Sequence, residues 1–349
     1  MIETILKYAN EAGASDVHIT VGIPPKMRVN GKLIDMDFPV LKQGDVVAIS
    51  MHVMNQVQQD AFEERGEYDM AFTLPGYGRY RVNVFKQRGS IALAFRIVST
   101  EIPDHASLGI PESVVNLYQR KRGLILVTGP TGSGKSTTLA SLIDKINENR
   151  DAHIITLEDP IEYLHRHKLS IVNQREIGSD SLSYSNALRA ALREDPDVIL
   201  VGEMRDLDTI SIAIRAAETG HLVLSTLHTI GAASTVDRII DVFPPHQQQQ
   251  IRVQLASVLE AIISQQLLPT ADGTRRVAAF EVLHATYPAR NLIRENKAFQ
   301  LPNVMQTGRG VGMITMDDAI MQLYIDGVID RDTAIQFAQS PETMYQKVY

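Results

Sequence analysis

Short apolar runs alternate with segments of helical spacing through the middle of the chain, from residue 112 to residue 231. Residues 124–128 form a nearly unbroken apolar run, which is typical of a strand buried on both faces. The pattern predicts strands at 124–128, 153–157, 197–201 and 221–226, and helices at 135–147, 186–193 and 207–219. This order of strands and helices predicts a parallel sheet covered by helices, so the expected fold class is α/β.

Beyond residue 231 the pattern becomes mostly helical. Apolar positions at helical spacing predict helices over residues 247–266, 289–296 and 316–324. We therefore expect a helical C-terminal part that follows the sheet and belongs to the same domain.

The first hundred residues have a different pattern, which predicts a small mixed α+β domain. Its expected elements are a helix at residues 3–12, a strand at 17–21, and hairpins at 26–34 and 79–98. Asn30-Gly31 is a strong signal for the turn of the first hairpin. In the second hairpin, apolar and polar residues alternate around a turn near Arg88-Gly89.

The length of 349 residues is more than one ordinary hydrophobic core contains, which favours two domains. Pro103, Gly109 and Pro111 lie between the two patterns and indicate a linker. We therefore expect a smaller N-terminal domain at residues 1–98, a linker at 99–111 and a larger domain at 112–349.

Composition and charge weigh against several classes of protein. Hydrophobic residues make up 44% and charged residues 21% of the chain, which is typical of a folded globular protein. The apolar runs are too short for a membrane span and the N-terminus lacks a signal-peptide pattern, so we expect neither membrane insertion nor secretion. The absence of cysteine excludes disulfides and thiolate zinc sites, which fits the cytoplasm. A net charge of −7 weighs against a dedicated nucleic-acid binder.

Residues 129–137 (GPTGSGKST) fit the P-loop pattern, with a predicted strand before them and a predicted helix after them. Glycines let the backbone wrap a phosphate, and the amides at the helix start supply partial positive charge. Lys135 would reach the β- and γ-phosphates of ATP, and the hydroxyl of Ser136 would bind Mg²⁺. The alternative is a glycine-rich turn with a surface lysine. The nucleotide-binding candidates are Thr131, Gly132, Ser133, Gly134, Lys135, Ser136 and Thr137.

Acidic residues follow two of the predicted strands. Glu203 comes just after the strand at 197–201, where a parallel sheet places ligand-binding residues, so it is a candidate to activate the attacking water. Glu158, Asp159 and Glu162 follow the strand at 153–157, and of these Glu158 is the candidate to hold the magnesium shell. The alternatives are a surface carboxylate in a loop for Glu203 and a solvated acidic loop for the second group.

His228 lies at the end of the strand predicted at 221–226, where a histidine could donate to the γ-phosphate and distinguish ATP from ADP. A lone histidine is more often structural, which is the alternative for His228. His221 begins the same strand at its opposite end and is the weaker nucleotide-binding candidate.

These four motifs, in this order and spacing, resemble the secretion-superfamily ATPases of type IV pili and type II secretion. In the family's terms they are the Walker A motif (129–137), the Asp box (154–165), an atypical Walker B motif (197–203) and the His box (221–229). Gly202 makes the Walker B motif atypical, because many P-loop ATPases have a carboxylate there.

The resemblance covers nearly the whole chain and implies more than nucleotide binding. Members of this family are hexamers with a PAS-like N-terminal domain and a RecA-like C-terminal domain. Residues 14–19 look like the family's N-terminal signature, and residues 291–295 and 304–308 look like the C-terminal region of PilT-type retraction ATPases. Arg81 and Arg96 look like the family's catalytic arginines, the alternative being cross-strand surface charges.

The resemblance implies a hexameric, ATP-hydrolysing motor that powers type IV pilus disassembly and retraction. It would act with an inner-membrane platform protein of the pilus, at the cytoplasmic face of the inner membrane. Extension and secretion ATPases typically carry a long extra N-terminal region and a tetracysteine zinc module, and this chain begins directly at the PAS-like domain without cysteine. Those ATPases, a regulatory nucleotide-binding module and a DNA translocase are the alternatives.

Overall fold

The structure is a computed structural model that describes residues 1–29, 31–99 and 101–348. It divides into two compact units, which are described separately. The first contains Met1–Glu101 and Pro160–Leu164, and the second contains Ile102–Asp159 and His165–Tyr349. Asn30, in the predicted turn of the first hairpin, lies outside the described residues. Within the described part of the chain, no helix is both long and apolar enough to span a lipid bilayer.

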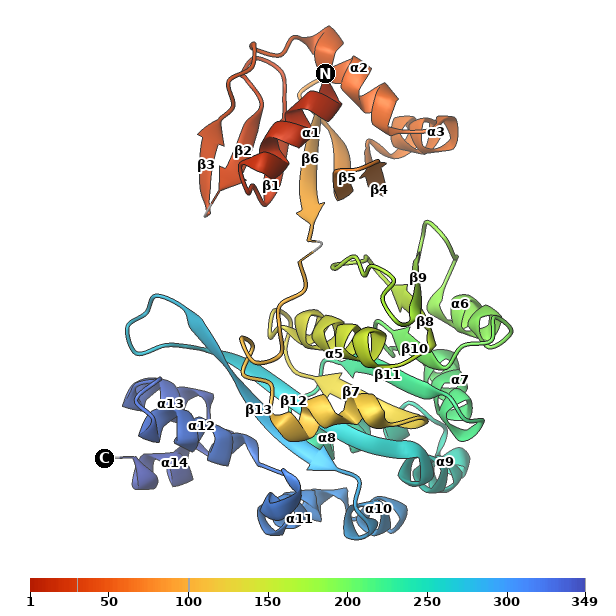
Figure 1. Cartoon of the computed structure of the whole chain (residues 1–349), viewed down its shortest axis with the longest axis vertical. Helices are drawn as coiled ribbons and strands as arrows, with labels where there is room; N and C mark the ends of the chain where they lie inside the picture. Colours follow the sequence, from red (N-terminus) through yellow and green to blue (C-terminus); the bar gives the residue numbers. More distant parts are fainter. Residues whose placement is uncertain (30, 100, 349) are drawn as a thin grey trace. The chain divides into compact units, whose positions relative to one another are not determined.

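The first unit has a six-stranded antiparallel sheet with the strand order β3-β2-β1-β6-β5-β4, accompanied by three helices (Figure 1). Its core includes Ile5, Leu6, Tyr80 and Phe95, all fully buried. The elements are α1 (Ile2–Glu11), β1 (Asp16–Ile19), β2 (Lys26–Val29), β3 (Lys32–Asp35), α2 (Gln43–Val53), α3 (Gln56–Arg65), β4 (Glu67–Leu74), β5 (Gly78–Gln87) and β6 (Ser90–Val98).

The predicted second hairpin is present as β5 and β6, and it turns at Arg88 and Gly89 with φ angles of 45° and 75°. The pattern missed α2, α3 and β4. The apolar residues of α2 are spread around the helix, and α3 buries only Phe62, so neither sequence shows the one-sided apolar stripe on which the prediction depends.

The second unit has a seven-stranded sheet in the order β13-β12-β7-β11-β10-β8-β9. Its strand pairs are parallel except for β12 and β13, which are antiparallel. The elements up to the end of the sheet are α4 (Glu112–Val115), β7 (Gly123–Thr128), α5 (Lys135–Asn149), β8 (His153–Glu158), β9 (Ile171–Glu176), α6 (Tyr184–Ala191), β10 (Val198–Val201), α7 (Leu207–Glu218), β11 (Leu222–Leu227), α8 (Ala232–Asp241), α9 (Pro245–Val258), β12 (Leu259–Pro269) and β13 (Arg276–His284). The helices that follow are α10 (Tyr287–Arg294), α11 (Leu301–Thr307), α12 (Met316–Ile325), α13 (Arg331–Phe337) and α14 (Pro341–Lys347).

Helices cover both faces of this sheet. Ile125 and Val127 of β7 pack with α4 and α5, whereas Leu124 and Leu126 pack in a separate cluster with α6 to α11. Successive side chains of a strand point to opposite faces, so the two clusters lie on opposite sides of the sheet. The predicted α/β fold class, with its parallel-rich sheet and a smaller α+β part, is confirmed.

The helix predicted over residues 247–266 is wrong in its second half. Helix α9 ends at Val258, and strand β12 begins at Leu259. Most of β12 is buried on both faces, so its apolar and polar residues do not alternate, and periodicity does not distinguish this strand from a helix. Ile262 and Ile263, which are β-branched, were the only local indication of a strand.

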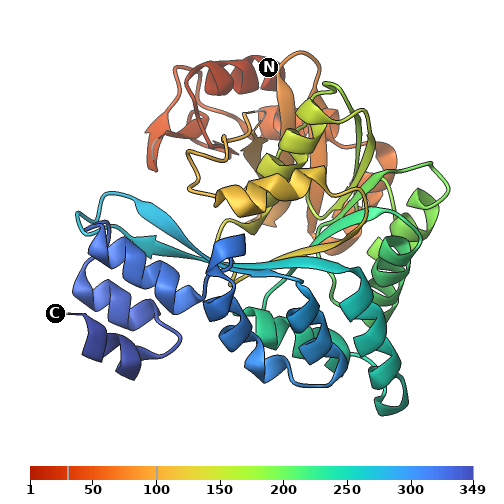
Figure 2. The same cartoon turned by 60° about the horizontal axis from the view of Figure 1, so that its bottom comes forward.

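Helices α12, α13 and α14 form a cluster of their own beside the end of β12 and the start of β13 (Figure 2). Met316, Ile320 and Ala334 pack there against Leu268 and Ala279 of the two strands. Strands β12 and β13 therefore belong both to the central sheet and to the packing of the C-terminal helices.

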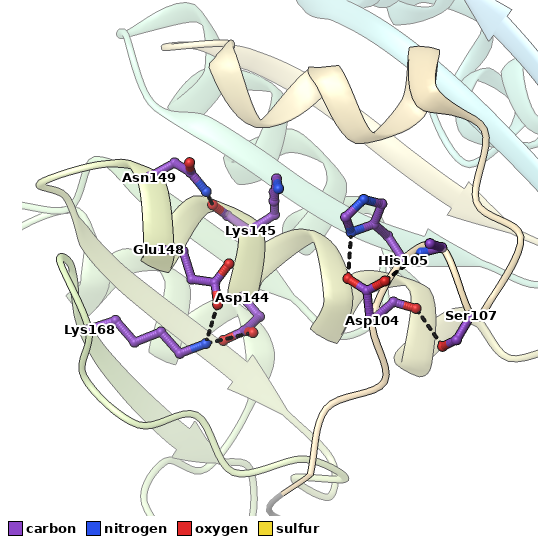
Figure 3. A network of polar contacts seen from close by, with 9 residues as sticks. Asp104, His105, Ser107, Asp144, Lys145, Glu148, Asn149 and Lys168 are labelled. Atoms are coloured by element: carbon purple, nitrogen blue, oxygen red, sulfur yellow. Dashed lines mark hydrogen bonds and ion pairs between the residues drawn. The ribbon is translucent and has the colours of Figure 1, made fainter.

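A polar network fixes the loop between β8 and β9 to helix α5. Figure 3 shows Lys168 of this loop in contact with Asp144 and Glu148 of α5, each at 2.8 Å from its Nζ. Beside it, the fully buried Asn147 donates from Nδ2 to the main-chain oxygen of Arg166 at 2.7 Å. The Asn147 Oδ1 accepts from the Lys168 amide at 3.1 Å.

We expect Asn147→Ala to lower the free energy of unfolding by about 1–3 kcal/mol, because it removes two partly buried hydrogen bonds, with the Arg166 carbonyl and the Lys168 amide, and leaves a cavity at a fully buried position. Urea unfolding followed by circular dichroism measures the change. The matched control is Asn149→Ala, which removes only an exposed hydrogen bond to the Lys145 carbonyl. An equal loss of unfolding free energy in the two variants would contradict the view that Asn147 fixes the loop between β8 and β9 to α5.

Candidate nucleotide-binding site

The loop between β7 and α5 has the backbone that a phosphate cradle requires. Gly129, Gly132 and Gly134 have φ angles of 141°, 77° and 88°, which side chains with a Cβ rarely adopt. At Gly129 a Cβ atom would also lie 2.2 Å from the main-chain oxygen of Gln265 on the adjacent β12. Gly134 is the N-cap of α5, so the helix begins at the loop and directs its first amides there.

Lys135 is 9% exposed, and its ammonium group lies over the loop. Its Nζ donates to the main-chain oxygens of Gly129 at 2.9 Å and Pro130 at 3.0 Å. Thr131 and Gly132 are exposed at the tip, and Ser136 and Thr137 are half-buried in the first turn of α5. The predicted phosphate-binding residues therefore form one continuous cradle.

Gln265 supports this cradle from β12, and the sequence analysis missed it. It is 1% exposed, and its Nε2 donates to the main-chain oxygen of Ser133 at 2.6 Å. The mistaken extension of the preceding helix through residue 266 concealed it, because a helix there gives no reason to place Gln265 beside the P-loop.

Glu203 and His228 meet at the carboxyl ends of β10 and β11. Val201 and Ser225 are paired in these parallel strands, so the residues that follow them emerge side by side. The His228 Nε2 lies 3.2 Å from the Glu203 Oε1, and the Arg205 Nη2 lies 2.6 Å from the Glu203 Oε2. Two groups that can donate hydrogen bonds therefore face the same carboxylate.

Arg205 also affects the charge state of Glu203. Burial raises the pKa of Glu203, but the hydrogen bonds and electrostatic interactions from Arg205 and His228 together bring the pKa below its ordinary value. The carboxylate therefore stays ionised and able to accept a proton at neutral pH.

We expect Arg205→Ala to move the acidic limb of the pH profile of ATP hydrolysis to higher pH. The substitution removes an interaction that favours the ionised carboxylate, so the pKa of Glu203 rises and the base is lost earlier as the pH falls. Steady-state ATPase assays between pH 4 and 9 on Arg205→Ala and on Arg189→Ala, an exposed arginine of α6, would measure it. If the acidic limb stays at the same pH in both variants, Arg205 does not lower the pKa of Glu203 in the working enzyme.

Glu158 ends β8, which is the neighbour of β10 on the side away from β11. Its Oε1 accepts hydrogen bonds from the Thr156 hydroxyl at 2.6 Å and from the Gln174 Nε2 at 3.1 Å. These bonds hold the carboxylate at the same sheet edge as Glu203. No cluster of three or more metal-binding side chains occurs among the described residues. Mg²⁺ commonly takes one or two protein oxygens together with phosphate and water, and the Ser136 hydroxyl and the Glu158 carboxylate are oxygen ligands of that kind.

Tyr184 explains why glycine occupies position 202. A Cβ on Gly202 would lie 2.9 Å from the Tyr184 hydroxyl oxygen and 3.1 Å from the Leu157 main-chain oxygen. Burial and the charges of Asp159, Glu203 and Glu158 raise the pKa of Tyr184, so its hydroxyl stays protonated. The Tyr184 side chain therefore occupies the space that the Cβ of an acidic residue at position 202 would need.

His221 is not brought to the P-loop. It lies just before β11, and its main-chain oxygen accepts from Gly123, the first residue of β7, at 3.0 Å. Its Nδ1 lies 2.9 Å from the Ala216 main-chain oxygen. The P-loop follows the last residue of β7, so His221 occupies the opposite edge of the sheet.

Arg81 and Arg96 belong to the first unit, where they are cross-strand partners on β5 and β6. Arg96 is 70% exposed, and its Nε lies 3.1 Å from the Asp16 Oδ1. The two arginines line a pocket of about 310 Å³ together with Glu162, Tyr163 and other residues of this unit. They therefore present positive charge at a concave surface of the first unit.

Comparisons with known proteins cover almost the whole chain. Residues 1–336 match the family described as "Type II/IV secretion system protein". The chain is 46% identical over 341 residues to the "Type IV pilus retractation ATPase PilT" of Pseudomonas aeruginosa, covering 98% of this chain and 99% of that protein. It is 48% identical over 320 residues to the "Twitching motility protein" of Neisseria gonorrhoeae, covering 92% and 86%. The crystal structure of "the Pilus Retraction Motor PilT and Bound ADP" is similar with a TM-score of 0.90 and 51% identity, covering 98% of each chain.

Proposed function

This chain belongs to the Type II/IV secretion system protein family, and on that premise we propose that it is the ATP-hydrolysing motor that retracts type IV pili. The chain is an ATPase, as expected from its P-loop, and the resemblance to PilT-type ATPases seen in its motifs is confirmed. The observation that carries the catalytic part is the contact of His228 with Glu203 at the sheet edge. The pilus part is supported by near-complete alignment with proteins named for retraction and twitching.

In the proposed mechanism, the amides of the P-loop and the Lys135 ammonium bind the phosphates of ATP. Ser136 and Glu158 would hold Mg²⁺, which would neutralise phosphate charge when bound. Glu203 accepts the proton of the attacking water, and His228 keeps Glu203 oriented while sensing the γ-phosphate. The P-loop amides and Lys135 stabilise the negative charge that develops on the phosphate oxygens in the transition state more strongly than that of the ground state, and this difference lowers the barrier to hydrolysis.

We propose that the working form is a homo-hexamer that acts on an inner-membrane platform protein at the cytoplasmic face of that membrane. The solved PilT structure and the structure of the Legionella pneumophila ATPase DotB, with TM-scores of 0.90 and 0.82, are the support for this kind of assembly. Arg81 and Arg96 are proposed to neutralise transition-state charge. His221 is retained only as a weaker proposal, because its position lies at the other sheet edge.

Cells whose only copy of the protein carries Glu203→Gln provide the test. We expect twitching to be lost and surface pili to increase, because pili would still extend but would not be retracted. Loss of pili would indicate an extension motor, and no change in either trait would indicate a regulatory or DNA-linked role. Glu342→Gln, at an exposed position of α14, is the control for expression and assembly.

A further inference from the structure

Strands β12 and β13 hold the start of α8 with two neighbouring side chains. Ser264 and Glu281 are cross-strand partners, so they lie on the same face of the sheet. The Ser264 Oγ accepts from the Gly231 amide at 3.0 Å, and the Glu281 Oε1 accepts from the Ala232 amide at 2.7 Å. Two successive amides at the start of α8 are therefore fixed to the sheet.

The second oxygen of Glu281 contacts the C-terminal helices. Its Oε2 accepts from the Met316 amide, at the start of α12, at 3.2 Å. It also accepts from the Gln339 Nε2 at 3.4 Å. Asp317 in the same turn of α12 accepts from the Gln339 amide at 2.6 Å. One carboxylate therefore joins the start of α8 to the cluster formed by α12, α13 and α14.

Glu281 is only 3% exposed. Burial raises its pKa, and the hydrogen bonds from Ala232, Met316 and Gln339 act in the opposite direction. Burying a carboxylate is costly, and the two helix N-termini that it contacts offset part of that cost. An apolar side chain would fill the same space without this cost, so the hydrogen bonds themselves are what a glutamate adds.

The start of α8 is close in the chain to the catalytic contact. Residues 229–231 are all that separate His228 from Ala232, and the Thr229 hydroxyl is further tied to the Thr235 hydroxyl at 2.7 Å. His228 in turn contacts Glu203 at 3.2 Å. Because so few residues separate them, a displacement of the Ala232 backbone is expected to displace His228 as well.

We propose that Glu281 is a positioning residue that sets His228 against Glu203 and ties this contact to the C-terminal helices. The inference rests on the proposed ATPase mechanism. Ser264 holds the neighbouring amide and supports the same loop. Movement of α12 to α14 would then alter hydrolysis through Glu281, without any contact between those helices and the nucleotide.

Steady-state ATPase kinetics on a double-mutant cycle test this positioning role. We expect Glu281→Gln to lower kcat about 10-fold and to change the KM for ATP less than about twofold, because the P-loop is untouched. In the His228→Ala background the same substitution is expected to change kcat less than about twofold, because its route of action is already removed. An equal fold-loss of kcat in both backgrounds would overturn the proposal. Ser264→Ala should behave in the same way with a smaller loss, and Glu342→Gln is the matched control.

Hydrogen exchange measured by mass spectrometry tests the linkage without turnover. In Glu281→Gln we expect faster exchange in peptides covering residues 228–236 and 315–322 than in the rest of the second unit. Unchanged exchange in both peptides would overturn the inference. If the wild-type chain failed to hydrolyse ATP, the proposed function would fail, whereas the exchange result would still decide the linkage.

Discussion

Glutamine in place of Glu203 is expected to lower kcat for ATP hydrolysis by about 10²–10⁴-fold, the range over which general bases contribute. Glutamine has nearly the same shape but cannot accept the proton of the attacking water. It also loses the charge that holds the Arg205 and His228 side chains at 2.6 and 3.2 Å. The loss should therefore exceed the loss caused by Arg205→Ala.

ATP binding should survive this substitution, because the P-loop and Lys135 belong to β7 and α5 rather than to β10. Phosphate-release assays measure kcat, and fluorescence titration with a labelled ATP analogue measures affinity. Glu342→Gln is the control for a change of charge on the surface. Retained hydrolysis in Glu203→Gln would mean that another group acts as the base.

Alanine in place of Lys135 is expected to weaken ATP binding by about 100-fold or more, since charge-assisted hydrogen bonds to phosphate are among the strong polar contacts. The ammonium group is nearly buried and already positioned over the loop by the Gly129 and Pro130 carbonyls. In the proposed site it would therefore reach the phosphates of ATP with little loss of side-chain entropy.

Equilibrium titration with a labelled ATP analogue measures this affinity, and circular dichroism establishes that Lys135→Ala is folded. Lys121→Ala removes an exposed lysine before β7 and is expected to leave the affinity unchanged. Comparable loss in both variants would indicate a general effect of net charge rather than a specific phosphate contact.

Local sequence patterns were sufficient for the four central parallel strands, β7, β11, β10 and β8, but they missed β9, which pairs in parallel with β8. Strands β7, β8, β10 and β11 are fully or almost fully buried and each contains a short apolar run, and helical or turn-rich segments separate them along the chain. The pattern failed at β12, where burial on both faces removed the periodicity that separates a strand from a helix. It also missed β13, which follows β12 directly in the chain and pairs with it as a hairpin.

The main residues of the candidate site could be predicted from the sequence for a related reason. The P-loop is a continuous segment whose glycines and lysine act through local backbone geometry, and Glu203 and His228 stand at strand ends, where parallel sheets gather ligand-binding residues. The pairing of Glu203 with Arg205, by contrast, depends on side-chain directions beyond a strand end, which spacing does not specify.

The sequence by itself determined that this is an α/β P-loop ATPase, because a phosphate cradle is built from consecutive residues. Only the tertiary structure decided how the cradle is supported. Gln265 reaches it from β12, and Glu281 joins α8 to α12 from β13. Tyr184 fills the space beside Gly202. These relations depend on which strands become neighbours, and the packing of the whole sheet sets that order.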